Sequence, residues 1–321
     1  MGTISNFIEA NYKHFNAREL VDSARAYKKF IAEGGKMLVS LAGAMSTGEL
    51  GISLAKMIRA GKVHIISCTG ANLEEDLFNL VGNKTYKMLP NYRDLTPQDE
   101  VELRDAGFSR VTDTCISEEA WLFIADKFME YAAEAANNGE AFFPYQYFYR
   151  MIREGVVDNH MQVPRENSWM IAACEMGIPI VSPGWEDSTL GNIFAANVFE
   201  KKIKTHNAVH GGTEQFEFML RWYLENDQKY RLGFFQIGGG IAGDFPICVT
   251  PSIRNDLRRE CKSWQYFSQI SDSTTSYGSY SGAVPNEKIS WNKLDADTPK
   301  FMIESDASIV APLIFAYVLD E

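Results

Sequence analysis

The sequence predicts an α/β protein in which a parallel sheet carries helices on its faces. Short apolar runs rich in β-branched and aromatic residues alternate with longer segments whose apolar residues recur at helical spacing. This alternation is typical of strand–helix–strand units, whose strands lie parallel in one sheet. No low-complexity linker divides the 321 residues, and 45% hydrophobic content suffices for a large core. We predict one domain, 1–321, with a helical N-terminal segment (1–35) and an α/β core (36–321).

The N-terminal part of the chain contains one complete strand–helix–strand unit. The apolar spacing in residues 6–33 predicts a helix, which is interrupted at Asn16 and Ala17 and ended by Gly34 and Gly35. Two β-rich apolar runs then flank an amphipathic segment, which predicts a buried parallel pair of strands. The predicted strand, helix and strand cover residues 36–43, 46–61 and 63–70, respectively.

The same alternation returns after a middle section that we expect to be helical. Residues 116–138 predict a long amphipathic helix, with Ser117 as its N-cap and two acidic residues in its first turn. Further elements follow to the C-terminus. The predicted strands are 178–184, 232–240, 264–271 and 300–305, and the predicted helices include 211–226 and 307–319.

Composition restricts the class of function. The net charge of −11 disfavours binding to nucleic acid and is compatible with a cationic substrate. No run of about eighteen apolar residues occurs, and the N-terminus lacks the layout of a secretory signal, so we expect a cytoplasmic protein that does not enter the membrane. The five cysteines and five histidines are scattered, without CxxC or HExxH patterns, so we expect reduced thiols and no metal site.

Ligands of open parallel sheets bind at the carboxyl ends of the strands, so the stretches that follow predicted strands are candidate sites. The first is TGANLEED (69–76), in which small residues allow close approach to the backbone. Its acidic residues Glu74, Glu75 and Asp76 lie near the start of a predicted helix. Capping of that helix by acids is the simpler interpretation of this stretch.

Two further stretches follow later strands. WEDSTLGN (185–192) places Asp187 where it could accept hydrogen bonds from ribose, although an ordinary turn explains the stretch equally well. GGGIAG (238–243) matches the spacing of a dinucleotide-binding fingerprint, but Pro246 and the run beyond it predict no helix that could face a phosphate. We therefore expect these glycines to bring backbone close to a ligand without forming that fingerprint.

A long stretch rich in glycine and serine, SDSTTSYGSYSGAVPNEKISWNKL (271–294), lies between two predicted strands. Loops of this length inside a compact domain are commonly functional. Near its end, Lys293 stands two residues after Trp291. Burial beside an indole would remove hydration from the ammonium and favour a neutral, nucleophilic amine. Spacing alone equally permits an exposed surface lysine.

The chain resembles the deoxyhypusine synthase family over nearly its whole length. The resemblance lies in five motifs that occur in the family's order: TGANLEED, SPGWEDSTLGN, IGGG, SGAVPNEKISWNKL and SDAS (305–308). It implies a Rossmann-like fold, with helices on both faces of the sheet, and a homotetramer whose sites lie between subunits. It also implies NAD as cofactor and a polyamine such as spermidine as substrate.

The resemblance further implies covalent chemistry at Lys293. In the family, NAD takes hydride from the carbon beside the secondary amine of spermidine, the lysine captures the aminobutyl group as an imine, and an acceptor amine receives it. Trp291 would shield the alkyl chain and Glu287 would pair with an ammonium of the amine. The other implied amine-binding residues are Glu74, Asn192, Asp244, Gly278, Ser279 and Tyr280, and the cofactor-binding residues are Ser46, Thr47, Thr69, Gly70, Ala71, Glu75, Asp187, Gly239, Asp306 and Ala307.

The chain departs from the family pattern at positions that would contact the amine. Asn192 replaces an aspartate, and Tyr277 and Tyr280 replace two others. Asp244 stands where the family has a histidine that contacts the amine. These changes predict altered donor or acceptor specificity, with either a protein lysine or a free diamine such as putrescine as acceptor.

Two other hypotheses remain open from the sequence. One is a non-catalytic protein that binds NAD or an amine, motivated by Asn192, Tyr280 and Asp244. The other is an amine dehydrogenase that releases NADH without group transfer. Both keep the fold but differ in the role they give to Lys293.

Overall fold

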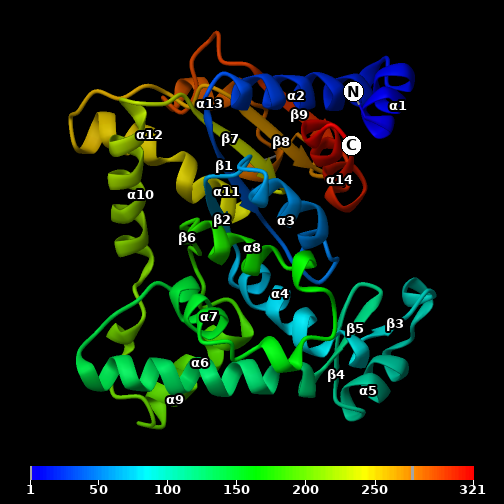
Figure 1. Ribbon diagram of the computed structural model, residues 1–321, viewed down its shortest axis with the longest axis vertical. Coiled ribbons are helices and arrows are strands. Elements are labelled where there is room, and N and C mark those ends of the chain that lie inside the picture. The colour runs from blue at the N-terminus through cyan, green and yellow to red at the C-terminus, as the bar shows by residue number, and fades with distance from the viewer. Residues whose placement is uncertain (1, 276–277) are drawn as a thin grey trace.

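The computed structural model describes residues 2–275 and 278–321 and contains a central parallel sheet, as predicted (Figure 1). Every pairing within this sheet is parallel, beginning with Leu38 opposite Ile65 in the first predicted pair. Its strands are β1 (Lys36–Leu41), β2 (Ile65–Cys68), β6 (Ile180–Val181), β7 (Leu232–Ile237), β8 (Phe267–Ser271) and β9 (Lys300–Glu304).

The strands lie in the order β6-β2-β1-β7-β8-β9. The first three strands along the chain extend from the centre to one side, and the last three extend to the other. This is the 3-2-1-4-5-6 order of doubly wound dinucleotide-binding folds, and the direction of winding reverses between β1 and β7. Ligands of such sheets bind beyond the carboxyl ends of the strands near this reversal.

Helices cover both faces of the sheet, as predicted. Met37 and Val39 of β1 point into a core with helices near the N- and C-termini, whereas Leu38 points into a second core on the opposite face. The helices are α1 (Thr3–Asn11), α2 (Phe15–Ala32), α3 (Gly51–Arg59), α4 (Gly70–Gly82), α5 (Pro97–Asp105), α6 (Glu118–Asn138), α7 (Pro144–Arg153), α8 (Trp169–Met176), α9 (Thr189–Phe199), α10 (Gly212–Asp227), α11 (Gly240–Ile247), α12 (Val249–Pro251), α13 (Glu287–Ser290) and α14 (Ala307–Leu319).

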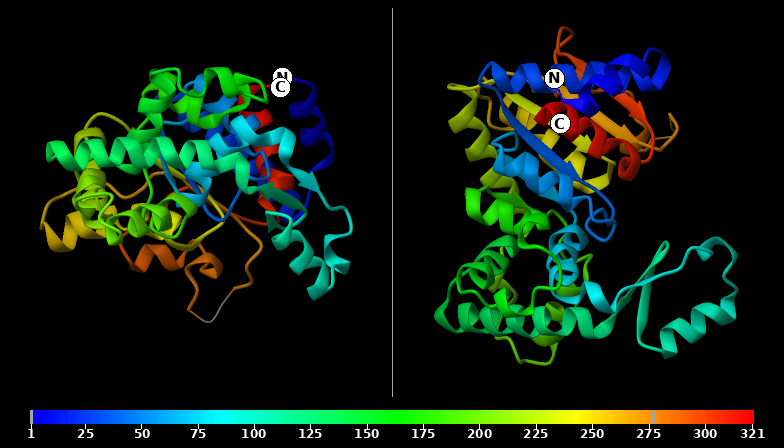
Figure 2. Two further views of the ribbon diagram at one scale, coloured as in Figure 1. Left: turned by 90° about the horizontal axis from the view of Figure 1, so that it is seen from below. Right: turned by 45° about the vertical axis from the view of Figure 1, so that its right-hand side comes forward.

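The middle section is not purely helical, which corrects the prediction. A small antiparallel sheet in the order β3-β5-β4 forms there and, with α5, stands away from the central sheet (Figure 2). Its strands are only two to four residues long, so they give little periodic signal. They are β3 (Lys87–Met88), β4 (Phe108–Val111) and β5 (Thr114–Ser117).

The N-terminal helix is interrupted earlier than expected. The chain leaves the helical conformation between Asn11 and Phe15, whereas Asn16 lies inside α2. The side chain of Asn16 accepts a hydrogen bond from the backbone N–H of Glu304 at 2.8 Å, which ties the start of α2 to the end of β9. Asn16 thus makes a tertiary contact from within the helix and does not interrupt it. The boundary at residue 35 between an N-terminal segment and the core stays a prediction.

The glycine-rich stretch after β7 does lead into a helix, contrary to the prediction. Gly239 is the N-cap of α11, and Pro246 lies within this helix. Proline leaves the carbonyl four residues earlier, that of Ala242, without its helical partner. The hydroxyl of Ser67 donates to this carbonyl at 2.8 Å and compensates for the loss. The helix therefore forms despite Pro246, because a hydrogen bond from β2 replaces the one that the proline removes.

Candidate active site

Lys293 is held rigidly in the segment between α13 and β9, next to the residues that lead into β8. It follows α13 after Asn292, which has a left-handed backbone conformation with φ of 58°. The N–H of Lys293 donates to the carbonyl of Lys288, and its own carbonyl accepts from Trp264, both at 3.1 Å. The hydroxyl of Thr250 donates to the carbonyl of Asn292. These bonds fix the direction in which the Lys293 side chain leaves the backbone.

The side chain of Lys293 is buried, as the nucleophile hypothesis requires. The residue is only 7% exposed. Its Nζ donates to Oδ1 of Asp244 at 2.9 Å and lies 5.3 Å from the ring centre of Tyr280 and 5.8 Å from that of Trp291. The amine is therefore enclosed by one carboxylate and two aromatic rings.

Trp291 shields Lys293 on one side only, since the indole is 62% exposed in the single chain. Ile241 at the start of α11 and Val284 in the preceding loop are also exposed apolar side chains. Both belong to segments that border the Lys293 site. The surface around the site thus exposes several apolar side chains, as surfaces that contact a partner commonly do.

A cavity of about 290 Å³ opens at Lys293 and brings together many of the predicted residues. Its charged lining residues are two acids, Asp244 and Glu287, and two lysines, Lys288 and Lys293. The predicted amine-binding residues in its wall are Asp244, Gly278, Ser279, Tyr280, Glu287 and Trp291, and the others are Cys248, Thr275, Gly282, Ala283 and Lys288. Tyr277, which also departs from the family pattern, lies outside the described residues.

Tyr280 anchors the glycine- and serine-rich loop to the sheet. Its hydroxyl donates to Oε1 of Gln236 in β7 at 2.7 Å, and burial raises its pKa well above the ordinary value, so the phenol stays protonated. The next residue, Ser281, accepts from Gln269 through its carbonyl and from the N–H of Gly240 through its hydroxyl. Tyr280 is therefore a fixed neutral wall of the cavity where an aspartate was expected from the family.

The glycines after β7 are packed against this loop. A Cβ at Gly239 would lie 2.0 Å from Oγ of Ser281, so any larger side chain would displace the loop. We expected the backbone of these glycines to approach a ligand closely. In the structure, the backbone of Gly239 closely approaches the loop that contains Ser281. The role of Gly239 towards a cofactor stays a prediction.

The three acids of α4 do not cap their own helix, whose N-cap is Thr69. Glu74 accepts from the N–H groups of Thr189 and Leu190 at 2.8 and 2.9 Å and so caps α9. Both of its oxygens are engaged, and within one chain it does not line the Lys293 cavity. Burial raises the pKa of Glu74.

Asp76 caps a second neighbouring helix. It accepts from the hydroxyl of Ser168 and from the N–H groups of Trp169 and Met170 at the start of α8. Burial raises its pKa to about 6. Asp76 therefore holds α8 in place and has no oxygen left over for a ligand.

Glu75 receives a hydrogen bond from the hydroxyl of Thr47, and both side chains are buried. Burial, together with the charge of Glu74, raises the pKa of Glu75 to about 7. Ser46 beside them is also buried, with its hydroxyl bonded to the carbonyl of Asn72 and to the indole N–H of Trp169. These residues connect the end of β1 to the start of α4.

The remaining predicted cofactor residues also follow strand ends. Gly70 and Ala71 begin α4 beyond β2, and Asp306 and Ala307 begin α14 beyond β9, where Asp306 accepts from Ser308. Asp187 lies beyond β6 with an exposed carboxylate that makes no hydrogen bond or ion pair to any residue the structure describes. These positions are spread along the ligand-binding edge of the sheet.

Asn192 is placed away from the Lys293 cavity. It lies on α9, exposed, and its side-chain amide donates to the carbonyl of Glu186 at 2.6 Å. With Glu74 it belongs to the β2 and β6 side of the sheet, whereas Lys293 and Glu287 belong to the β8 side. A single chain does not bring these two groups of predicted amine-binding residues together.

Lys288 is a residue of this cavity that the sequence interpretation missed. It is 2% exposed, and burial, reinforced by the nearby charge of Lys293, lowers its pKa to about 8. The only sequence signal was its position five residues before Lys293 within EKISWNK. That spacing is common to many surface lysines, so burial could not be inferred from it.

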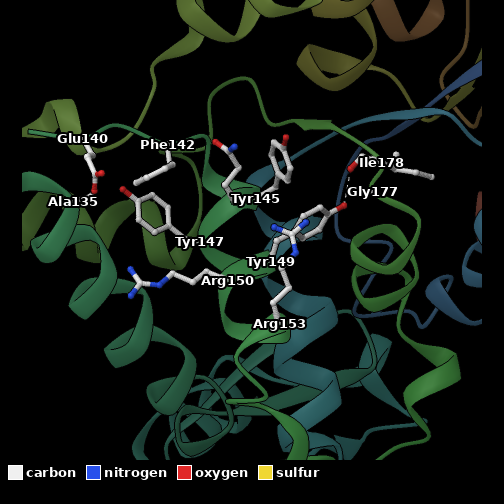
Figure 3. A pocket seen from close by; sticks show the side chains of 11 residues that line it. Ala135, Glu140, Phe142, Tyr145, Tyr147, Tyr149, Arg150, Arg153, Gly177 and Ile178 are labelled. Carbon is white, nitrogen blue, oxygen red and sulfur yellow. Dashed lines mark hydrogen bonds between the residues drawn. The ribbon is translucent and has the colours of Figure 1, made fainter. Parts of the chain in front are cut away.

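A second cavity of about 310 Å³ lies between α7, the end of α6 and the turn before β6 (Figure 3). Tyr145, Tyr147 and Tyr149 form much of its wall, and Arg150 and Arg153 point from α7 towards it. It shares no lining residue with the Lys293 cavity. Because Ile178 precedes β6, this cavity borders the amino end of that strand, opposite the ligand-binding edge of the sheet.

Residues 2–275 and 278–321 contain neither a membrane-spanning helix nor a metal site. No helix in these ranges has the length and apolarity needed to cross a membrane. The same ranges contain no group of three or more histidine, cysteine or acidic side chains arranged to hold a metal ion.

The buried Glu75 predicts how stability depends on pH. In the unfolded chain this carboxyl ionises near its ordinary value of 4.5, whereas in the folded protein it keeps its proton up to about pH 7. The folded state therefore binds more protons between these values, and the free energy of unfolding falls as pH rises through them. We expect Glu75→Gln to flatten this fall in urea denaturation curves recorded from about pH 4.5 to pH 7. An unchanged slope in the variant would contradict the assignment.

Comparisons with known proteins place the chain in a family. The sequence model of the family "DS: Deoxyhypusine synthase" matches residues 8–318. A deoxyhypusine synthase-like protein of Cyanothece sp. is 28% identical, over 99% of this chain and 80% of its own length. A protein of Archaeoglobus fulgidus assigned as deoxyhypusine synthase 1 is 23% identical, over 95% of this chain and 90% of its own length.

Among solved structures, a candidate deoxyhypusine synthase from Entamoeba histolytica has a TM-score of 0.57 at 13% identity, over 97% of this chain and 90% of that one. This likeness concerns the fold. Strand order defines a Rossmann-like α/β protein, and a buried lysine lines a cavity beside its sheet. The chain belongs to the deoxyhypusine synthase family, because the family's sequence model spans nearly all of it. Membership supports an aminobutyl transferase of the deoxyhypusine synthase type.

Proposed function

We propose that the protein is an NAD-dependent aminoalkyl transferase that acts on a polyamine such as spermidine through an imine on Lys293. The observation that carries the proposal is the buried Nζ of Lys293, in contact with Asp244 and open to a cavity lined by α11, α13 and the loop that follows β8. A surface lysine would need neither the enclosure nor the cavity. Family membership supports the same chemistry.

The residues at the strand ends fit a dinucleotide. The winding of the sheet reverses between β1 and β7, and Ser46 and Thr47 follow the first of these strands while Gly239 follows the second. The exposed carboxylate of Asp187 is of the kind that accepts hydrogen bonds from ribose hydroxyls. Bound NAD would supply a hydride acceptor for the carbon beside the secondary amine.

Lys293 performs the transfer in this proposal. Its neutral amine adds to the carbon of the oxidised C=N group and forms a new C–N bond. The bond from that carbon to the departing amine then breaks as a proton moves from the lysine nitrogen to the leaving nitrogen. Asp244, at 2.9 Å from Nζ, is placed to carry that proton. Attack by an acceptor amine releases Lys293 in the same way, and return of the hydride from the reduced cofactor would convert the resulting imine into the amine product.

The charges of the cavity support an altered choice of amine. Asp244 and Glu287 are balanced by Lys288 and Lys293, so this half of the site carries no excess of acid for a multiply charged polyamine. Tyr280 adds a neutral wall, and Asn192 cannot neutralise a cation. Donor or acceptor therefore differs from the spermidine and protein lysine of the family, and a free diamine acceptor fits these changes.

A second copy of the chain would complete the site. Glu74 and Asn192 do not reach the Lys293 cavity within one chain, and the exposed face of Trp291 is suited to burial in a subunit interface. We therefore propose a homo-oligomer, with a tetramer as the family's implied form, and a cytoplasmic location. Measurement of mass in solution tests the assembly.

The activity is tested by incubating the protein with NAD and spermidine, putrescine or agmatine, one amine at a time and in pairs. NADH formation with at least one amine and a new amine product in the paired reactions are expected. Homospermidine as the product would identify a free diamine acceptor. Stoichiometric NADH with no product would indicate an amine dehydrogenase, and no NADH with any amine would leave a binding protein; either result overturns the proposed transfer.

A further inference from the structure

Lys288 is buried in the cavity of Lys293. Its Nζ lies between two aromatic rings, 5.0 Å from the ring centre of Phe267 and 4.7 Å from that of Tyr280. It donates to the carbonyl of Ala283 at 3.3 Å and forms no salt bridge to the residues that the structure describes. An ammonium has three N–H donors, and this single hydrogen bond satisfies only one of them. The rings and the carbonyl therefore compensate only partly for the lost hydration of the charge.

Lys288 and Lys293 lie over the same ring. The Nζ atoms are 4.7 and 5.3 Å from the ring centre of Tyr280, and both line the same cavity. Their charges repel, and the positive charge of Lys293 is one of the causes that lower the pKa of Lys288 to about 8, after burial. Such a coupling is mutual, because each charge acts on the other with the same energy.

We infer that Lys288 is a second functional lysine of this site, whose positive charge disfavours the ammonium form of Lys293 and so increases the supply of the neutral amine that attacks. The inference rests on the proposed role of Lys293 as nucleophile. A neighbouring cation is one of the known ways to activate a lysine. Lys288 is therefore a positioning residue that acts electrostatically and forms no bond to the substrate.

The other groups that face the two lysines set the balance against which Lys288 acts. Asp244 on α11 stabilises the Lys293 ammonium through its 2.9 Å contact, and Glu287 on α13 adds a weaker negative charge near Lys288. Cys248 after α11 and Tyr280 stay neutral, because burial raises the pKa of each. Lys288 is thus the one cation in the cavity's wall, within the described residues, that opposes Asp244. The proton released by Lys293 leaves to solvent past Asp244, whose side chain is half-exposed.

A purely structural role for Lys288 makes a different prediction. Its contacts with Phe267, Tyr280 and Ala283 join β8 to the loop before α13, so its side chain could serve only to hold that loop. Loss of such a clamp would lower the melting temperature. It would not by itself change the pH at which Lys293 loses its proton.

The two roles are separated by labelling amines with trinitrobenzenesulfonate, which reacts only with neutral amines, and by quantifying each labelled lysine with peptide mass spectrometry across pH. In Lys288→Met, we expect the labelling rate of Lys293 near neutral pH to fall about three- to tenfold and its half-labelling pH to rise. Lys288→Arg keeps the charge and should retain the wild-type profile. Neither NAD nor substrate is present, so the result is independent of whether transferase activity is found.

The reciprocal variant keeps the test decisive if Lys288→Met does not fold. In Lys293→Met, the half-labelling pH of Lys288 should rise above its wild-type value of about 8. Thermal melting verifies that each variant analysed is folded. Equal half-labelling pH in the wild type and in the folded Met variants would overturn the inference and leave Lys288 as a loop clamp.

Discussion

We expect Lys293→Arg to abolish the proposed transfer of the aminoalkyl group while leaving the fold intact. Arginine keeps the positive charge and can still pair with Asp244, whose Oδ1 lies 2.9 Å from the native Nζ. A guanidinium stays protonated at any pH the protein survives, so it cannot attack the oxidised carbon. We expect the rate of formation of the amine product to fall by about 10³-fold or more. The measurement is product formation from NAD and the amine identified as substrate.

Lys28→Arg provides the matched control. Lys28 also pairs with an aspartate, Asp320, but on the surface and far along the chain from the cavity. Its variant should retain wild-type turnover, and both variants should melt within a few degrees of the wild type. Transfer at an undiminished rate in Lys293→Arg would exclude a covalent lysine mechanism.

Asp76→Ala is expected to cause the largest loss of stability among simple substitutions at this edge of the sheet. The carboxylate is buried and accepts from the hydroxyl of Ser168 and the N–H groups of Trp169 and Met170. Its removal leaves these donors buried without an acceptor and uncaps α8. We expect the free energy of unfolding to fall by about 3 kcal/mol. Urea denaturation at neutral pH measures this loss.

Asp105→Ala is the comparison for an exposed acid. Asp105 forms its ion pair with the adjacent Arg104, and both side chains are more than half exposed. Such pairs contribute little, so this variant should lie within about 0.5 kcal/mol of the wild type. A similarly small effect of Asp76→Ala would show that water or a rearranged side chain replaces the cap.

The parallel sheet was predictable from the sequence because its strands are buried on both faces. Residues 36–43 and 63–70 are continuous apolar runs that flank a helical period, and the structure pairs them in parallel as β1 and β2. The elements that were missed depend on distant contacts. The helix α11 tolerates Pro246 because Ser67, far earlier in the chain, donates to the carbonyl that proline leaves free. No local pattern around Pro246 contains that information.

Some residues of the site were likewise predictable from the sequence, and others were not. The collinear motifs predicted Lys293, and the structure places it in a cavity with Asp244, Tyr280 and Glu287. Glu74, also predicted to bind the amine, caps α9 and lies outside this cavity, so its role stays a prediction. Motifs identify residue types and order, whereas the direction of a side chain depends on which helix packs beside it. The burial of Lys288 was not predicted, because it too depends on the elements that pack around the side chain.

The most direct test of the account is trapping of the covalent intermediate. The protein is incubated with NAD and each amine of the panel, reduced with borohydride and digested, and the peptides are analysed by mass spectrometry. We predict that an active amine adds the mass of an aminoalkyl group to the peptide that contains Lys293, and that Lys293→Arg carries no such addition. Formation of NADH and transfer product without any adduct on Lys293, or with the adduct on another lysine, would contradict the central claim.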